Sequence, residues 1–138
     1  MKIYQQSIKL SPKRRGFWLI TEEISKVVAN SGIKTGLANI FLKHTSASLS
    51  INENADPSVR DDFESFFSDL ADDKPYYIHT YEGSDDMPAH IKSSILSVNL
   101  TIPITNGRLN LGTWQGIYLG EHRDYASSRE IVITIQGI

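Results

Sequence analysis

Segments of alternating apolar residues and a strong turn signal constrain the fold of this chain more than any other feature. In residues 98–104 every second side chain is apolar, which is the period of a strand with one buried face. Asn106-Gly107 follows and favours a two-residue β-hairpin turn, in which both residues take positive φ. Residues 131–135 repeat the alternation. We therefore expect antiparallel strands to form most of the fold.

One helix is indicated clearly by its cap and its apolar spacing. Asp56 is suited to capping, and Pro57 is favoured at the first helical position. The apolar residues that follow recur at helical spacing, at Val59, Phe63, Phe66, Phe67 and Leu70. We expect them to form one buried face of this helix.

Two further helices are predicted, and together they define the fold class. Thr21 is expected to cap one of them, and Gly32 to end it. The other begins near Asp86 and Pro88, with Asp86 in a capping role. The expected fold is α+β, a mostly antiparallel β-sandwich with about three inserted helices, in a single domain of residues 1–138.

Composition and charge exclude several classes of protein. Fourteen basic and sixteen acidic residues give a net charge of −2, so no basic field for nucleic acid is present. The absence of cysteine excludes disulfides, zinc–thiolate sites and thiol nucleophiles. No stretch approaches the ~20 apolar residues of a membrane span. We expect a cytoplasmic protein that binds neither nucleic acid nor membranes.

Three of the four histidines form a candidate metal or catalytic group. His44 ends an apolar strand, His79 lies in a polar loop, and His90 lies in the first turn of the third helix beside two aspartates. Neutral imidazoles from different elements are a ligand set of the zinc type. The spacing does not require a metal, and scattered, hydrogen-bonded histidines are the alternative.

Carboxylates and hydroxyls near these histidines suggest proton transfer. Glu53 has no evident structural role, which makes it the better candidate for a general base. Ser46 and Ser48 share a strand face with His44, so a serine nucleophile is an alternative. However, the sequence around them is not a G-x-S-x-G nucleophile elbow.

Anion binding is indicated at the start of the third helix. The start of the third helix offers free N–H groups with Lys92 and Ser93 close by, and Arg60 could add charge. No phosphate-binding loop of the nucleotide type is present. Trp114 and Gln115 lie between glycines in "GTWQG", which is also typical of a tight subunit or sheet contact.

Three long motifs resemble one family over essentially the whole chain. They are "HTSASLSINENADPSVRDDFESFF", "DDMPAHIKSSIL" and "GRLNLGTWQGIYLGEHR". The chain resembles the YjbQ family, whose members are also labelled secondary thiamine-phosphate synthases. The resemblance implies a β-sandwich domain, assembly as a homotrimer, and a pocket of histidines and acidic groups that holds a metal ion in some members.

The resemblance also implies roles for particular residues. The implied metal ligands are His44, His79 and His90. The implied catalytic residues are His44, Glu53 and Asp56. The implied substrate-binding residues are Asn52, Asn54, Arg60, Asp86, Lys92, Ser93, Trp114 and Gln115. The family pattern has an aromatic residue at the position of His122, which therefore is not expected to be a ligand.

The implied activity is thiamine-phosphate synthesis from a pyrimidine diphosphate and a thiazole phosphate, with a small phosphorylated substrate as the ligand. Magnesium would suit the leaving diphosphate, whereas three imidazoles favour zinc or another transition ion. Two alternatives therefore stay open. One is a metal-assisted hydrolase of unknown substrate, and the other is a non-catalytic trimer that binds a metal or a metabolite.

Overall fold

Two antiparallel sheets form the body of the protein. The computed structural model describes all residues from Met1 to Ile138. The five-stranded sheet has the order β1 (Lys2–Lys9), β8 (Glu130–Gly137), β3 (Gly36–Leu42), β5 (Asn99–Thr105) and β6 (Arg108–Leu109). The three-stranded sheet has the order β2 (Gly16–Leu19), β7 (Gln115–Glu121) and β4 (Ala47–Glu53). All neighbouring strands are antiparallel, which confirms the predicted α+β fold.

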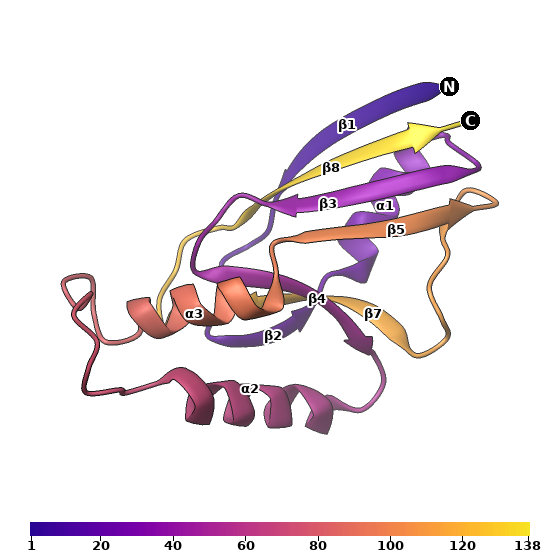
Figure 1. Ribbon diagram of the computed structural model, residues 1–138. Helices are drawn as coiled ribbons and strands as arrows, with labels where there is room; N and C mark the ends of the chain where they lie inside the picture. Colours follow the sequence, from indigo (N-terminus) through magenta and orange to yellow (C-terminus); the bar gives the residue numbers. More distant parts are fainter.

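Three helices are inserted between the strands, as predicted. They are α1 (Thr21–Ser31), α2 (Pro57–Ala71) and α3 (Asp86–Leu96). Figure 1 shows α3 beside the three-stranded sheet, level with β2 and β4, and α2 below α3, while α1 lies behind the strands. None of the helices combines the length and the apolar character needed to cross a membrane.

The main hydrophobic core lies between the two sheets and α1. Ile131, Ile133 and Ile135 of β8 are fully buried, which confirms that the alternating residues form one buried face. Ile40 of β3 and Leu49 of β4 pack in the same core cluster. The Asn106-Gly107 turn has φ angles of 53° and 77°, and it joins β5 to the two-residue β6 as the hairpin signal predicted.

The predicted helix ends are right in two cases and wrong in two. Asp56 caps α2, since its Oδ1 accepts a hydrogen bond from the backbone N–H of Ser58 at 2.9 Å. Gly32 ends α1 in the left-handed conformation. Thr21 does not cap α1, because its hydroxyl instead accepts from the N–H of Ile117 in β7. Asp86 is the first residue of α3 and does not cap it.

The apolar face of α2 is only partly buried. Phe63 and Phe67 pack on Phe17 of β2, and their ring centroids lie 5.6 and 6.1 Å, respectively, from that of Phe17. Phe66 is 61% exposed and Leu70 is 45% exposed, so the prediction of one buried face was wrong for these two residues. The physical reason is that α2 meets the narrow three-stranded sheet, which covers less of the helix than a wide sheet would.

Candidate functional site

Asp86 brings two histidines together at the start of α3. Its side chain is buried, and Oδ2 lies 2.8 Å from His79 Nε2 and 3.1 Å from His90 Nε2. His90 reaches Asp86 because the two residues are four apart on α3. The loop that precedes α3 supplies His79. Arg123, just after β7, donates to Asp86 Oδ1 at 2.7 Å and so orients the carboxylate.

The hydrogen bond between His90 and Thr45 determines which ring nitrogen of His90 faces Asp86. Nδ1 of His90 lies 2.8 Å from the carbonyl oxygen of Thr45, and a carbonyl can only accept, so Nδ1 carries a proton. If the ring is neutral, Nε2 therefore has no proton, and its lone pair faces the carboxylate oxygen of Asp86. Two lone pairs at 3.1 Å repel unless a proton or a metal ion lies at this point.

The charge state of Asp86 agrees with this arrangement. Burial raises the pKa of the carboxyl, but the contacts with His79, His90 and Arg123 outweigh it and hold the pKa below its usual value. Asp86 is therefore an ionised acceptor at neutral pH.

His79, Asp86 and His90 together have the donor set of a transition-metal site. Their three ligand atoms all lie within 4.8 Å of one another. Two imidazoles and one carboxylate suit zinc or a similar ion better than magnesium, which prefers oxygen ligands. Half of the His79 side chain is exposed, so further coordination positions would face solvent.

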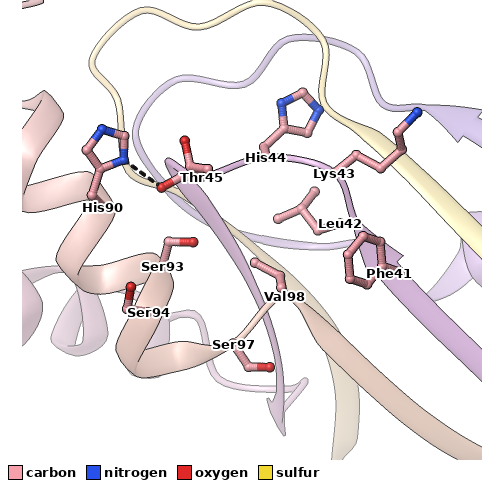
Figure 2. A pocket seen from close by; sticks show the side chains of 10 residues that line it. All are labelled: Phe41, Leu42, Lys43, His44, Thr45, His90, Ser93, Ser94, Ser97 and Val98. Atoms are coloured by element: carbon pink, nitrogen blue, oxygen red, sulfur yellow. Dashed lines mark hydrogen bonds between the residues drawn. The ribbon is translucent and has the colours of Figure 1, made fainter.

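His90 also borders the largest pocket, which has a volume of about 850 Å³. Figure 2 shows this pocket between α3 and the end of β3, with the dashed bond from His90 to Thr45 at one side and His44 beyond it. Its lining residues are Phe41, Leu42, Lys43, His44, Thr45, His90, Ser93, Ser94, Ser97 and Val98. His79 and Asp86 do not line it, so His90 is the one residue that the pocket shares with the group of three candidate ligands.

His44 belongs to the pocket and not to the group of three ligand atoms. Its Nε2 accepts a hydrogen bond of 2.8 Å from the backbone N–H of Glu130. Burial, followed by the positive charge of Arg129, lowers the pKa of His44. The sequence predicted a trio of His44, His79 and His90, and the structure brings together the last two with Asp86.

Most of the other predicted residues lie at the opposite end of the three-stranded sheet. β4 has seven residues and starts beside the pocket, so its far end is about 20 Å away. Glu53 pairs with Gln115 in the β4–β7 ladder, and the Asn54 amide donates to the Gln115 carbonyl. The predicted residues at this end are Asn52, Glu53, Asn54, Asp56, Trp114 and Gln115.

The three predicted anion-binding residues are separated. Ser93 lines the pocket, and its contact with a ligand stays a prediction. Lys92 is fully buried, and its Nζ lies 2.9 Å from Asp72 Oδ1, so it does not reach the pocket. Arg60 lines a separate depression of about 270 Å³ with Arg14 and Arg15. Lys92 and Ser93 are both buried, but successive side chains on a helix point about 100° apart, so the two face different neighbours.

The structure does not pair Ser48 with His44, as the hypothesis of a serine nucleophile requires. Ser48 Oγ lies 2.8 Å from His122 Nε2, and both residues are completely buried. The partner of Ser48 is thus His122 and not His44. No substrate reaches a hydroxyl that is sealed in this way, so the pair is part of the packing.

For two residues of the candidate site, the sequence reasoning missed the contacts that the structure shows. Asp86 was expected to cap α3 or to contact substrate, although its i, i+4 spacing to His90 is the signal that pairs the two. Arg123 donates to Asp85, to Asp86 and to the carbonyl of Glu82, and nothing in the local sequence indicates these contacts.

Comparison with known proteins places the chain in a family. Residues 6–138 match the family described as "UPF0047 protein YjbQ-like". The chain is 55% identical to the UPF0047 protein YjbQ of Salmonella typhimurium and 52% identical to that of Escherichia coli O157:H7. Each match covers 97% of this chain and 98% of the relative.

Solved structures of similar fold also come from this family. A crystal structure of a YbjQ-like protein of unknown function from Sulfolobus solfataricus P2 superposes with a TM-score of 0.90 at 28% identity, covering 99% of both chains. A YjbQ/UPF0047 protein from Clostridium acetobutylicum gives 0.82 at 38% identity, covering 96% of this chain and 99% of the other. The chain belongs to the YjbQ (UPF0047) family, a family of unknown function.

Proposed function

We propose that this protein is a metal-dependent enzyme acting on a small phosphorylated molecule, with the ion held by His79, His90 and Asp86. The observation that carries the proposal is the convergence of both Nε2 atoms on one carboxylate oxygen while His90 Nδ1 is committed to Thr45. The contact between His90 Nε2 and Asp86 Oδ2 needs a proton or a metal ion, and the donor set of the three residues fits a transition ion.

The residues around the candidate ligands have defined tasks in this proposal. The Thr45 carbonyl holds the His90 ring in one tautomer, which is the usual task of an outer partner at a metal site. Arg123 occupies Asp86 Oδ1 and leaves Oδ2 for the ion. A transition ion held here would supply Lewis-acid polarisation of a phosphoryl oxygen and an activated water. Metal-assisted hydrolysis is therefore the reaction class that we place first.

Thiamine-phosphate synthesis is the activity that the family label suggests, and it remains a second proposal. That reaction releases pyrophosphate, for which magnesium with carboxylate ligands is the natural partner. Asp86 is the one carboxylate in the group of three ligand atoms. We rank this activity below hydrolysis for that reason, and a non-catalytic metal-binding protein is the third possibility.

Elemental analysis of the protein purified without a histidine tag tests the metal site. We expect about one equivalent of zinc or another transition ion per chain in the wild type. His79→Ala, His90→Ala and Asp86→Asn should each lose more than the ~10–100-fold in affinity that follows loss of an outer partner. Asp61→Asn, at an exposed carboxylate of α2, is the control and should retain the ion.

The result that would end this proposal is a wild type that binds neither zinc nor manganese after incubation and dialysis, while circular dichroism shows a folded protein. Activity is then assayed on the metal-loaded enzyme with 4-nitrophenyl phosphate, and separately with the pyrimidine diphosphate and thiazole phosphate pair. Phosphate release favours the hydrolase, and thiamine phosphate formation favours the synthase. A loaded protein inactive in both assays favours the binding protein.

The homotrimer that the resemblance implies is also a proposal for this chain. Several large apolar side chains are exposed to solvent, among them Leu37 and Ile3 on the five-stranded sheet and Phe66 on α2. Ile78, Tyr81 and Tyr125 are each at least 95% exposed. Exposed apolar surface on this scale is typical of a protein that associates.

A further inference from the structure

The pocket beside His90 carries no acidic residue. Its lining side chains that can be charged are Lys43, His44 and His90, and its remaining polar side chains are hydroxyls. The hydroxyls are those of Thr45, Ser93, Ser94 and Ser97. Phe41 and Val98 add an apolar wall at the side away from His90 (Figure 2). A ligand matched to this lining presents hydrogen-bond acceptors at one end and an apolar body at the other.

His44 has only one possible arrangement of its ring proton when it is neutral. The backbone N–H of Glu130 can only donate, so His44 Nε2 at 2.8 Å must be the acceptor. The single ring proton is therefore on Nδ1. Burial and the charge of Arg129 oppose a second proton by lowering the pKa of the ring. Nδ1–H makes no hydrogen bond within the chain, so it is a donor without a partner.

The two ends of the pocket differ in their electrostatics. α3 ends at Leu96, so Ser97 and Val98 lie beside the negative end of the helix dipole, which disfavours an anion. Figure 2 shows Thr45 and His44 at the other side of the pocket from Ser97, with Thr45 bonded to His90 and His44 beyond Thr45. We therefore place the oxyanion beside His44, where Arg129 and Lys43 offset the carboxylates of Glu121 and Glu130. The apolar part of the ligand then lies against Phe41 and Val98.

We propose that this pocket binds the oxyanion of a phosphate monoester, and that His44 recognises it by donating a hydrogen bond from Nδ1–H to a phosphate oxygen. The inference rests on the proposed function only for the choice of phosphate as the oxyanion, because the geometry of His44 does not depend on the metal. It replaces the expectation that His44 is a metal ligand with a role in specificity.

Two substitutions separate the two ring nitrogens. The amide of asparagine can place a donor near the position of Nδ1, whereas the longer glutamine places its polar group near Nε2, where it can still accept from Glu130. His44→Asn should retain phenyl phosphate binding within about threefold. His44→Gln should lose at least about tenfold, as expected when one hydrogen bond to a charged group is removed. Calorimetry with phenyl phosphate measures both.

Nitrogen-15 NMR provides a readout that a purely structural role would not change. We expect the resonance pattern of a ring protonated at Nδ1, and a downfield shift of that proton when phenyl phosphate is added. Both His44 variants should bind as much zinc as the wild type. This separates the inference from the proposed metal site, since the NMR titration of the metal-free protein remains informative if no metal binds.

Four results would overturn the inference. They are a ring protonated at Nε2, an Nδ1–H resonance that does not respond to phenyl phosphate, unchanged affinity in His44→Gln, and loss of zinc from either His44 variant. The last of these would return His44 to the ligand set.

Discussion

At the scale of single residues, the surroundings of His122 determine its protonation state. The ring is completely buried, with Nε2 beside the Ser48 hydroxyl and no partner for Nδ1. Burial lowers the pKa of His122 to about 3, and the charges of Lys92, Arg15 and Arg129 act in the same direction. His122 is therefore neutral at pH 7.

His122 should make the protein sensitive to acid. Above pH ~6.5 the ring is neutral in both states and contributes nothing. Between pH ~6.5 and about 3 the unfolded chain binds a proton that the folded chain refuses, so the free energy of unfolding decreases as the pH falls. In His122→Phe this dependence should weaken by up to ~1.4 kcal/mol per pH unit. Urea unfolding between pH 7 and pH 4.5 measures the difference.

Ser48→Ala is the matched control for this measurement, because it removes the partner of Nε2 and keeps the histidine. Its pH dependence should stay as steep as that of the wild type. Equal slopes for wild type and His122→Phe would show that the buried ring is protonated in the folded protein.

At the scale of the element, α2 shows that apolar spacing can predict a helix correctly and still predict only part of its burial. The spacing of Val59, Phe63 and Phe67 correctly predicts the helix, and Asp56 correctly predicts its start. The same spacing includes Phe66 and Leu70, which are exposed. Periodicity reports which residues share a face, whereas the width of the opposing sheet decides how many of them are covered.

Two substitutions on α2 test this division. Phe63→Ala removes a half-buried ring that packs on Phe17 and Tyr118, and should lower the free energy of unfolding by about 2–3 kcal/mol, below the 3–5 kcal/mol of a fully buried phenylalanine. Phe66→Ala, at the exposed position, should cost less than about 1 kcal/mol. Urea unfolding compares the two, and equal losses would contradict the assignment of the faces.

At the scale of the whole molecule, the exposed apolar side chains favour an assembly of several chains over a monomer. Ile78 and Tyr81 lie in the loop that carries His79, and Tyr125 is two residues after Arg123, so exposed apolar side chains are close in sequence to residues of the candidate site. Leu37 and Phe41 add to these from the five-stranded sheet. An isolated chain would leave all of this surface in water.

Sedimentation equilibrium tests the proposed homotrimer. We expect a mass of about three times the 15.5 kDa of one chain at micromolar concentration. The physical reason is the burial of exposed apolar surface at ~25 cal/mol per Å². A mass of one chain over the whole concentration range would exclude the trimer and leave the exposed residues unexplained.

The sequence by itself determined the local structure of this protein. Alternation placed the buried face of β5 and β8, the Asn-Gly pair placed the hairpin, and Asp56 with Pro57 placed the start of α2. These features depend on neighbours within a few residues, so a period of two or of 3.6 residues is sufficient to reveal them. The motifs also indicated the YjbQ family, which the comparisons confirmed.

Only the tertiary structure decided how the chemically active side chains are grouped. It joined His79 and His90 to Asp86, set His44 beside the pocket, and buried Lys92. The deciding contacts come from distant segments: Thr45 orients His90 across 45 positions, and Glu130 orients His44 across 86. The task of a histidine depends on what each ring nitrogen touches, and spacing along the chain carries no information about partners that folding brings from so far away.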